Sequence, residues 1–172
     1  TISGKGKMPK NMKFRGNTKI KKVIIKKGVT SIPDNAFKSC KKLKSVSIPN
    51  TVKSVGSYSF YNTAIENITI PKSVKTIGAG SLGNCKLLTT VTMPGKFKVY
   101  APNPEKNEDI MSRYDNIKSV KLNTILDISN MKYFSAMNVY TWNKDTKYKS
   151  YDGVVYSKDG KTVLGMPLKR DE

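Results

Sequence analysis

The side chains in this sequence best suited to redox or metal chemistry are two cysteines, Cys40 and Cys85. They occupy one column of an internal repeat, two repeats apart, with Thr63 in that column between them. Because neighbouring parallel strands lie about 4.8 Å apart, the two backbones are expected about 10 Å apart. A disulfide needs Cα atoms within about 7 Å of each other, so the pattern predicts two free thiols buried in the core. No second pair of ligands favours zinc.

The next candidates for chemistry are four acidic residues, Glu105, Glu108, Asp109 and Asp115. They could form a carboxylate pair for acid–base catalysis or a calcium site, but their spacing matches no EF-hand loop. The first three also suit the positive end of a helix dipole. Asn103 is suited to cap a helix and Pro104 to its first turn, so a short helix is predicted from about Pro104 to Tyr114.

The sequence lacks the other usual parts of an active site. It contains no histidine, so none of its serines has the general base that most often activates a nucleophile. Gly4 and Gly6 lack the third glycine and the strand-to-helix context of a phosphate loop, and a hairpin turn is predicted there instead. We therefore predict a non-enzyme with no cofactor and no metal.

Composition is consistent with one continuous core and a strongly basic surface. The chain has 172 residues, 37% of them hydrophobic, which suffices for one domain. No stretch is long and apolar enough to span a membrane, and Thr1 to Met8 lack the features of a signal peptide, so any targeting segment lies outside this sequence. Lysine and arginine total 32 against 12 acidic residues, and only Arg15, Arg113 and Arg170 are arginine. Lysine favours diffuse attraction over bidentate recognition.

Internal repeats organise most of the chain. Three windows superimpose, starting at Ile20, Leu43 and Ile65, and a fourth starts at Leu88 and then departs. The interval from Leu43 to Ile65 is shorter by a single residue than the equal intervals before and after it, and the lost residue falls just before Ile65. One such repeat cannot bury its own apolar edge, so stacked repeats must share a core.

Each column of the repeat has a physical use. The pattern LxxVxI places inward side chains on a short strand, and proline follows where the chain leaves the ladder. Phe37, Phe60 and Leu82 are expected to fill the far side of each turn. The strand residues predicted to be buried together are Val46, Ile48, Ile68, Ile70, Val91 and Met93.

These columns resemble the BspA-type (Treponema pallidum type) leucine-rich repeat, LxxVxIPxSVxxIGxxAFxxCxxL, over residues 20–99. TISGKGKMP resembles the hairpin that commonly precedes the first repeat, and YKSYDGVVYSKDGKTVLGMP resembles an insert between repeats. The resemblance implies a curved right-handed solenoid with short parallel strands on its concave face and few helices. It also implies a place on a bacterial or protist cell surface, in adhesin-like proteins that bind other macromolecules.

We expect one solenoid domain in four segments: a cap or hairpin at 1–19, regular leucine-rich repeats at 20–100, a helical insertion at 101–116, and degenerate repeats with a β-hairpin insert at 117–172. The repeat resumes at Ile117–Leu122, after a longer interval from Leu88 than those between the regular repeats, and a degenerate copy follows at Met137–Trp142. VVYS and KTVLGM flank Lys158-Asp159-Gly160, a strong tight-turn signal. Partial repeats at both ends predict a segment of a longer protein or a domain with atypical caps.

The repeat register also predicts two surfaces. Strand residues between the inward positions face outward on the concave sheet and form a candidate partner-binding face: Ser45, Ser47, Asn67, Thr69, Thr90, Thr92 and Lys121. Lysines are expected on the turns and the convex side, where one column is a candidate polyanion-binding site: Lys53, Lys75 and Lys98. A Ser/Thr ladder is equally compatible with a solvated sheet face.

Two function classes follow. In the first, a secreted or cell-surface module binds a protein or glycan on host or neighbouring cells, while its lysines hold it near anionic wall polymers or glycosaminoglycans. In the second, the formal charge of +20 serves nucleic-acid or other polyanion binding. The scarcity of arginine and the absence of a recognition helix or stacking motif argue against nucleic acid. A general lysine bias with no partner is the third alternative.

Overall fold

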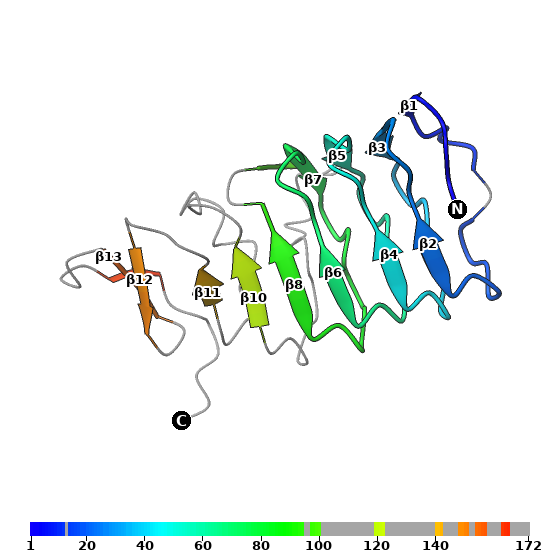
Figure 1. The fold of residues 1–172 in the computed structure, drawn as a ribbon. Helices are drawn as coiled ribbons and strands as arrows, with labels where there is room; N and C mark the ends of the chain where they lie inside the picture. Colours follow the sequence, from blue (N-terminus) through cyan, green and yellow to red (C-terminus); the bar gives the residue numbers. More distant parts are fainter. Residues whose placement is uncertain are drawn as a thin grey trace.

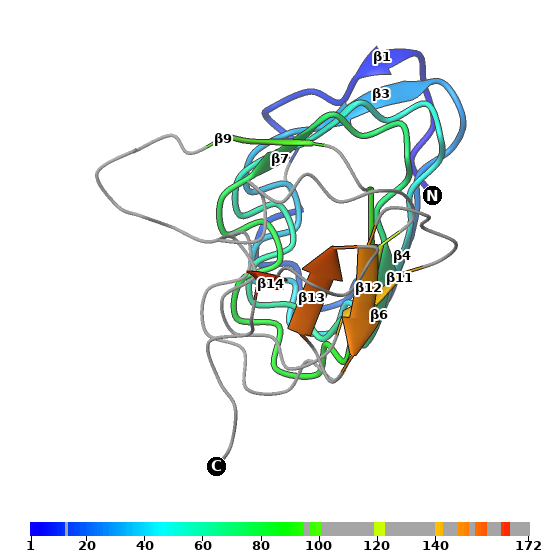
Figure 2. The same ribbon diagram turned by 90° about the vertical axis from the view of Figure 1, so that its left-hand side faces the viewer.

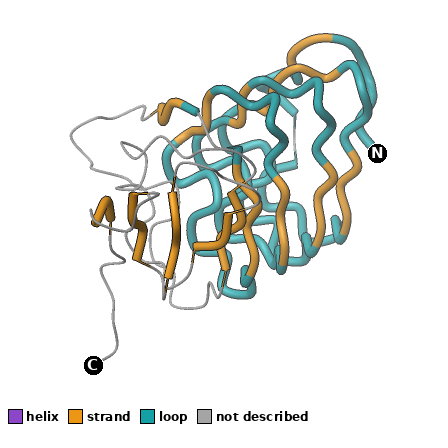
Figure 3. Tube along the Cα trace, turned by 60° about the vertical axis from the view of Figure 1, so that its left-hand side comes forward, coloured by secondary structure: helices purple, strands orange, loops and turns teal. Residues whose placement is uncertain are grey.

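The chain winds into a solenoid with two rows of parallel strands (Figure 1). The computed structural model describes residues 1–12, 14–94 and 97–100 with their side chains, and the backbone of the strands at 119–122, 140–142, 148–151, 154–157 and 163–165. These residues form strands, turns and loops and include no helix (Figure 3). We call one turn of the solenoid a rung and name it after its strand in the first row.

The first row, the face predicted to be concave, consists of β2 (Lys22–Ile24), β4 (Ser45–Ser47), β6 (Asn67–Thr69), β8 (Thr90–Met93), β10 (Ser119–Leu122) and β11 (Tyr140–Trp142). The second row consists of β1 (Gly6–Lys7), β3 (Val29–Ile32), β5 (Ser54–Val55), β7 (Thr76–Gly78) and β9 (Lys98–Tyr100). Viewed towards the end of the solenoid, the two rows occupy adjacent sides of the coil (Figure 2).

The predicted register of the later rungs is confirmed. Val120 of β10 pairs with Val91 of β8 and Leu122 pairs with Met93, so the repeat does resume after the longer interval. Strand β11 continues the row, with Tyr140 and Trp142 opposite Val120 and Leu122. Hydrophobic side chains therefore keep the same strand positions in a rung whose sequence has diverged.

The β-hairpin expected near the end of the chain is also present. Strands β13 (Val154–Ser157) and β14 (Val163–Gly165) pair antiparallel, and β12 (Tyr148–Tyr151) pairs antiparallel with β13 on its other side. The helix expected within 101–116, and the acidic residues on it, lie outside the described residues.

Of the cap or hairpin expected at 1–19, the structure has a cap but no hairpin, because the start of the chain forms part of another rung. Ile2 bridges Ile25 in parallel, and β1 pairs in parallel with β3. The Phe14 ring stacks on that of Phe37, with centroids 5.5 Å apart. Ile2 and Phe14 each precede their partners by the same interval that separates the first two repeat starts. This segment therefore caps the core as a divergent copy of the repeat itself.

The core runs the length of the described rungs as stacked columns. Phe37 and Phe60 are fully buried and stack with ring centroids 5.5 Å apart, and Leu82 continues their column, as predicted. Gly78 occupies a column where two rungs almost touch: a Cβ there would collide with the backbone of Gly56 and Ser57. Gly56, which follows Val55, would collide in the same way with Pro33 and Asp34, so glycine is required at both positions by close backbone approach.

Candidate binding surface on the first row

The outward side chains of the first row lie where the repeat register predicts. Ser45, Ser47, Asn67 and Thr69 are exposed, and Thr90 and Thr92 are half-buried. Ladder pairing sets Asn67 beside Thr90 and Thr69 beside Thr92. Lys121 lies beside Thr92 in the backbone register of β10 and β8, and its side chain is outside the described residues. The six candidate residues whose side chains are described thus share one face.

This face is interrupted between β4 and β6. The first row divides there into a β2–β4 pair and a separate β6–β8–β10–β11 sheet, whereas the second row runs unbroken from β1 to β9. In the neighbouring rungs, the Ile25 N–H donates to the Ser47 carbonyl at 3.0 Å and the Ile70 N–H donates to the Thr92 carbonyl at 2.8 Å. The equivalent Ile48 N–H has no hydrogen-bond partner among the described residues.

A shortened turn coincides with the interruption. Cys40 and Leu43 are three residues apart, as are Cys85 and Leu88, but Thr63 and Ile65 are only two apart. The Leu43 and Leu88 N–H groups each donate to the cysteine carbonyl at 2.9 Å, which closes a turn that rung β6 lacks. Strand β6 begins with a long 3.4 Å bond from the Glu66 N–H to the Lys44 carbonyl. We infer that the missing residue displaces β6 from its neighbour.

Two predicted core residues are affected, and for them the prediction of full burial is wrong. Val46 and Ile48 are only partly buried, whereas Ile68, Ile70, Val91 and Met93 in the same columns are at most 3% exposed. Strand β6 of the next rung would normally cover Val46 and Ile48, but it does not pair with β4. Sequence columns treat all rungs as equivalent, so they do not reveal this local exposure.

The interruption opens a cavity of about 330 Å³ on the first row. Its lining comes from three strands and the residue after β4: Val46, Ser47, Ile48, Asn67, Ile68, Thr69, Thr90 and Thr92. Five of these eight belong to the predicted partner-binding face; the apolar three were not predicted as part of it. None of the lining side chains carries a charge, so the cavity can offer apolar contact and neutral hydrogen bonds.

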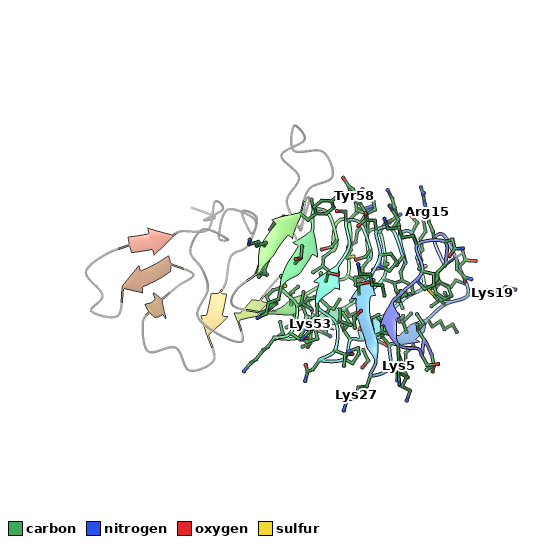
Figure 4. All side chains as sticks on the ribbon, turned by 90° about the horizontal axis from the view of Figure 1, so that it is seen from above. Lys5, Arg15, Lys19, Lys27, Lys53 and Tyr58 are labelled. Atoms are coloured by element: carbon green, nitrogen blue, oxygen red, sulfur yellow. The ribbon has the colours of Figure 1, made fainter. Side chains whose placement is uncertain are left out.

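The lysine column lies in the turns between the two rows. Lys53 and Lys75 directly precede β5 and β7, and Lys98 begins β9; all three are exposed. Their backbones are stacked, because the Lys75 N–H donates to the Lys53 carbonyl and the Lys98 N–H to the Lys75 carbonyl, both at 2.8 Å. Seen from above, Lys53 lies opposite Tyr58 (Figure 4). The column therefore lies at the start of the second-row strands and not on the side that carries Tyr58.

An aromatic pair on the side that carries Tyr58 was not predicted. Tyr58 and Tyr61 pack edge to face with centroids 5.6 Å apart, and the Lys38 Nζ lies 4.6 Å and 5.3 Å from the two ring centroids. The backbone of Tyr58 is left-handed, with a φ of 54°. Asn35 and Gly80, which occupy the same repeat position in the rungs before and after it, have φ of 58° and 63°. Asparagine and glycine are the residue types that tolerate this conformation. Their presence at this repeat position in the two neighbouring rungs could therefore have predicted the left-handed turn at Tyr58.

Both cysteines are free and fully buried, as predicted. The Cys40 Sγ donates to the Phe14 carbonyl at 2.9 Å, and the Cys85 Sγ donates to the Phe60 carbonyl at 3.1 Å. Thr63 occupies the column between them, with its Oγ1 3.2 Å from the Cys85 Sγ. Burial raises the pKa of the Cys40 thiol.

No group of three or more His, Cys, Asp or Glu side chains is placed to hold a metal ion in the part of the chain that the structure describes. Over the same residues, no helix has the length and apolar character needed to cross a bilayer.

Parallel two-row rungs with inward leucine, isoleucine and valine define a leucine-rich repeat solenoid. The chain belongs to the BspA-type leucine-rich repeat family, whose repeat region matches residues 10–139 in six copies. No curated protein matches the chain.

Several solved bacterial proteins share this fold. The leucine-rich repeat protein of Treponema pallidum is 22% identical, with a TM-score of 0.53 over 64% of this chain and 51% of that one. A leucine-rich repeat protein from Eubacterium ventriosum is 21% identical, with a TM-score of 0.55 over 91% of this chain and 42% of that one. One from Bacteroides ovatus is 16% identical, with a TM-score of 0.53 over 73% and 32%. This chain thus spans between 32% and 51% of their lengths.

Proposed function

We propose that this chain is a non-enzymatic binding module whose first row of strands receives a protein or glycan on host or neighbouring cells. The observation that carries the proposal is the cavity between β4 and β6, because it lies on the face where the outward Ser, Thr and Asn side chains gather. A regular solenoid sheet would present only a flat polar surface there. The cavity adds a concave site with an apolar floor, which is the usual form of a binding site.

The chemistry of the cavity supports binding over catalysis. Its lining consists of Val, Ile, Ser, Thr and Asn, none of which ionises near neutral pH. General acid–base catalysis needs a titratable group within hydrogen-bond reach of the substrate. A neutral lining can orient and hold a ligand through hydrogen bonds and apolar contact.

An extracellular place, secreted or attached to a cell surface, is part of the proposal. Its support is membership of the BspA-type family together with the surface location and adhesin-like role implied by that resemblance. The excess of lysine adds long-range attraction to the anionic polymers of cell walls and host surfaces.

Arrays of glycans and host proteins, probed with the labelled chain, would test this function. Ser47→Tyr and Thr69→Tyr would each fill the cavity mouth and should lower specific binding at least tenfold. Lys42→Tyr is the control, because Lys42 is exposed in the turn before β4 and does not line the cavity. Binding that both cavity variants retain in full would refute the proposed use of the first row.

A second candidate function, polyanion binding, is favoured by the lysine column. Three exposed ammonium groups on consecutive rungs repel one another, and a linear polyanion lying across the rungs would relieve that repulsion. Retention on heparin, measured against salt, would test this function. Reversal of Lys53, Lys75 and Lys98 to glutamate should lower the eluting salt concentration and flatten the salt dependence.

The matched control reverses three exposed lysines away from the column, Lys19, Lys21 and Lys41. Each triple reversal lowers the formal charge of +20 by six units, to +14. If both triple variants elute together, net charge alone explains retention and the column has no special role. Equal retention on DNA and heparin would extend the second candidate to nucleic acid.

A further inference from the structure

We infer that the cavity between β4 and β6 is a subsite for an uncharged sugar residue that carries an acylamino group, as N-acetylhexosamines do. The inference rests on the proposed function and names the class of ligand that the first row would receive. Three features carry it: an unused backbone donor beside an apolar wall, a rim of uncommitted hydroxyl groups, and the size of the cavity.

The first feature is the Ile48 N–H with its surroundings. The same N–H in rungs β2 and β6 donates to the carbonyl of the next rung, and at Ile48 no such acceptor is present among the described residues. Ile48 itself, with Val46 and Ile68, supplies the apolar part of the lining. An acetamido group has a carbonyl oxygen to accept from this N–H and a methyl group to contact the apolar wall. An unsatisfied donor at the edge of an apolar surface favours such a ligand.

The second feature is the rim. Four hydroxyl groups, of Ser47, Thr69, Thr90 and Thr92, line the cavity without a hydrogen-bond partner in the part of the chain that the structure describes. The side-chain amide of Asn67 on the same rim is equally uncommitted there. Each hydroxyl can donate and accept, and the amide offers both functions, so the rim matches the alternating donors and acceptors of a sugar ring.

Hydroxyl groups elsewhere in the rungs are used differently. The Thr51 Oγ1 donates to the Val29 carbonyl at 2.7 Å, and the Ser73 Oγ donates to the Val52 carbonyl at 2.7 Å. The Thr63 Oγ1 donates to the Phe60 carbonyl at 3.0 Å. These groups hold neighbouring or internal backbone, whereas the hydroxyls of the cavity rim make no hydrogen bond to any residue that the structure describes.

The third feature, the size of the cavity, and the absence of charge in its lining further restrict the class of ligand. A volume of about 330 Å³ lies at the small end of ligand sites, roughly 300–1,000 Å³, which suits one sugar residue of a longer glycan. No lining side chain is charged, so nothing in the lining would pair with a carboxylate, sulfate or ammonium group on that residue. A peptide amide shares the carbonyl but not the several ring hydroxyls that the rim could bind.

Two neutral trisaccharides would test the inference by titration calorimetry and by amide chemical shifts. The β-1,4-linked trimer of N-acetylglucosamine should bind and shift the Ile48 amide resonance. The β-1,4-linked trimer of glucose has the same linkage but no acetamido group, and it should bind at least tenfold more weakly. Equal affinity for both trimers, or no binding of either, would overturn the inference. So would equally strong binding of N-acetylalanine methylamide, which carries the amide without the sugar.

Variants separate this inference from the proposed function. Ser47→Tyr should lower affinity for the N-acetylated trimer at least tenfold, and Thr69→Tyr provides a second test should the first variant not fold. Lys22→Tyr, on the exposed face of β2 and outside the cavity lining, should leave that affinity within twofold. If neither trimer binds but an array partner is still lost in Ser47→Tyr, the sugar inference fails while the binding function stands. If binding to the array partner is unchanged in the cavity variants, the proposed binding function of the first row is itself contradicted.

Discussion

The ring of Tyr58 covers Gly80 of the following rung so closely that a Cβ at Gly80 would lie 2.6 Å from the Tyr58 Cε1. Gly80 also has a φ of +63°, in the left-handed region. Two separate effects therefore require glycine at this position: backbone conformation and the neighbouring ring. Similarly, Tyr61 covers Gly83, so both tyrosine rings of rung β4 rest on glycines of rung β6.

Gly80→Ala should lower the free energy of unfolding by about 1–3 kcal/mol, because it adds both left-handed strain and a steric clash. Gly16→Ala is the control for strain alone, since Gly16 has a φ of +72° and no atom within 4 Å of the added Cβ. Urea denaturation of both variants separates the two effects. Equal losses in the two variants would show that Tyr58 gives way without cost.

The Ile48 amide should exchange its hydrogen with solvent at least tenfold faster than the amides of Ile25 and Ile70. The latter two donate to the next rung at 3.0 Å and 2.8 Å, and Ile48 has no such partner among the described residues. The Lys53 amide is the control within the same rung, because it donates to the Thr30 carbonyl at 2.8 Å and should be protected. Protection of Ile48 equal to that of Ile70 would mean that the first row is closed in solution.

Replacing Ser59 with alanine should raise the free energy of unfolding by about 1 kcal/mol. Ser59 is fully buried and its Oγ has no hydrogen-bond partner within the described part of the chain, and Ala36 already occupies the same column one rung earlier. Ser81, in the next rung, has the same environment and should respond in the same way.

Thr51→Val is the matched control, because the Thr51 hydroxyl makes hydrogen bonds in the folded chain. The Thr51 Oγ1 accepts from the Gly28 N–H at 3.2 Å and donates to the Val29 carbonyl at 2.7 Å, so its loss should destabilise by about 1–3 kcal/mol. Opposite signs for Ser59→Ala and Thr51→Val in chemical denaturation are the expected result. A destabilised Ser59→Ala would indicate that the hydroxyl has a partner in solution.

Cys40 should react slowly with iodoacetamide in the folded protein and rapidly in denaturant. The side chain is fully buried, and burial raises its thiol pKa above the ordinary value, so little reactive thiolate is present near neutral pH. The sign of the linkage follows: the unfolded chain ionises first, at about pH 8.5. The stability contributed by the neutral thiol is therefore complete below that pH and is lost as the pH rises through the folded pKa.

The measurement is urea denaturation of the natural protein and of Cys40→Ala at pH 7 and pH 10. The difference between the two proteins isolates Cys40 from the lysines and tyrosines that titrate in the same range. The natural protein should lose more stability than the variant on going to pH 10. Equal losses, or native-state alkylation as fast as in denaturant, would contradict a buried neutral thiol.

The repeat columns were enough to predict the strands, the burial of the Phe37 column and the resumption of the ladder at Val120. Those features depend on the spacing and type of the residues, and stacked rungs must keep both so that equivalent side chains meet in the core. The N-terminal rung was missed because only Ile2 and Phe14 keep the repeat interval, with glycines and lysines between them. Its parallel pairing depends on contact with the next rung, whereas the hairpin prediction relied on the local turn residues Gly4 and Gly6.

The candidate site was predictable in part. Alternation along the strands placed Ser47, Thr69 and their neighbours on one face. The cavity was not predicted, although the residue missing before Ile65 was visible in the spacing. A column pattern gives the direction of each side chain but not the displacement of one strand from the next, and that displacement exposes Val46 and Ile48.

The unequal behaviour of the two strand rows has a mechanical consequence. Where β4 and β6 separate, the two rungs remain joined by the β5–β7 ladder and by backbone hydrogen bonds on the side of Tyr58, where the Phe60 N–H donates to the Ser81 carbonyl at 2.9 Å. The first row is therefore the side on which this junction has the fewest strand hydrogen bonds, and bending that spreads the first row would act there first. Tension or curvature imposed on the molecule would widen or narrow the gap at Ile48. The affinity of the cavity for a ligand would then respond to force.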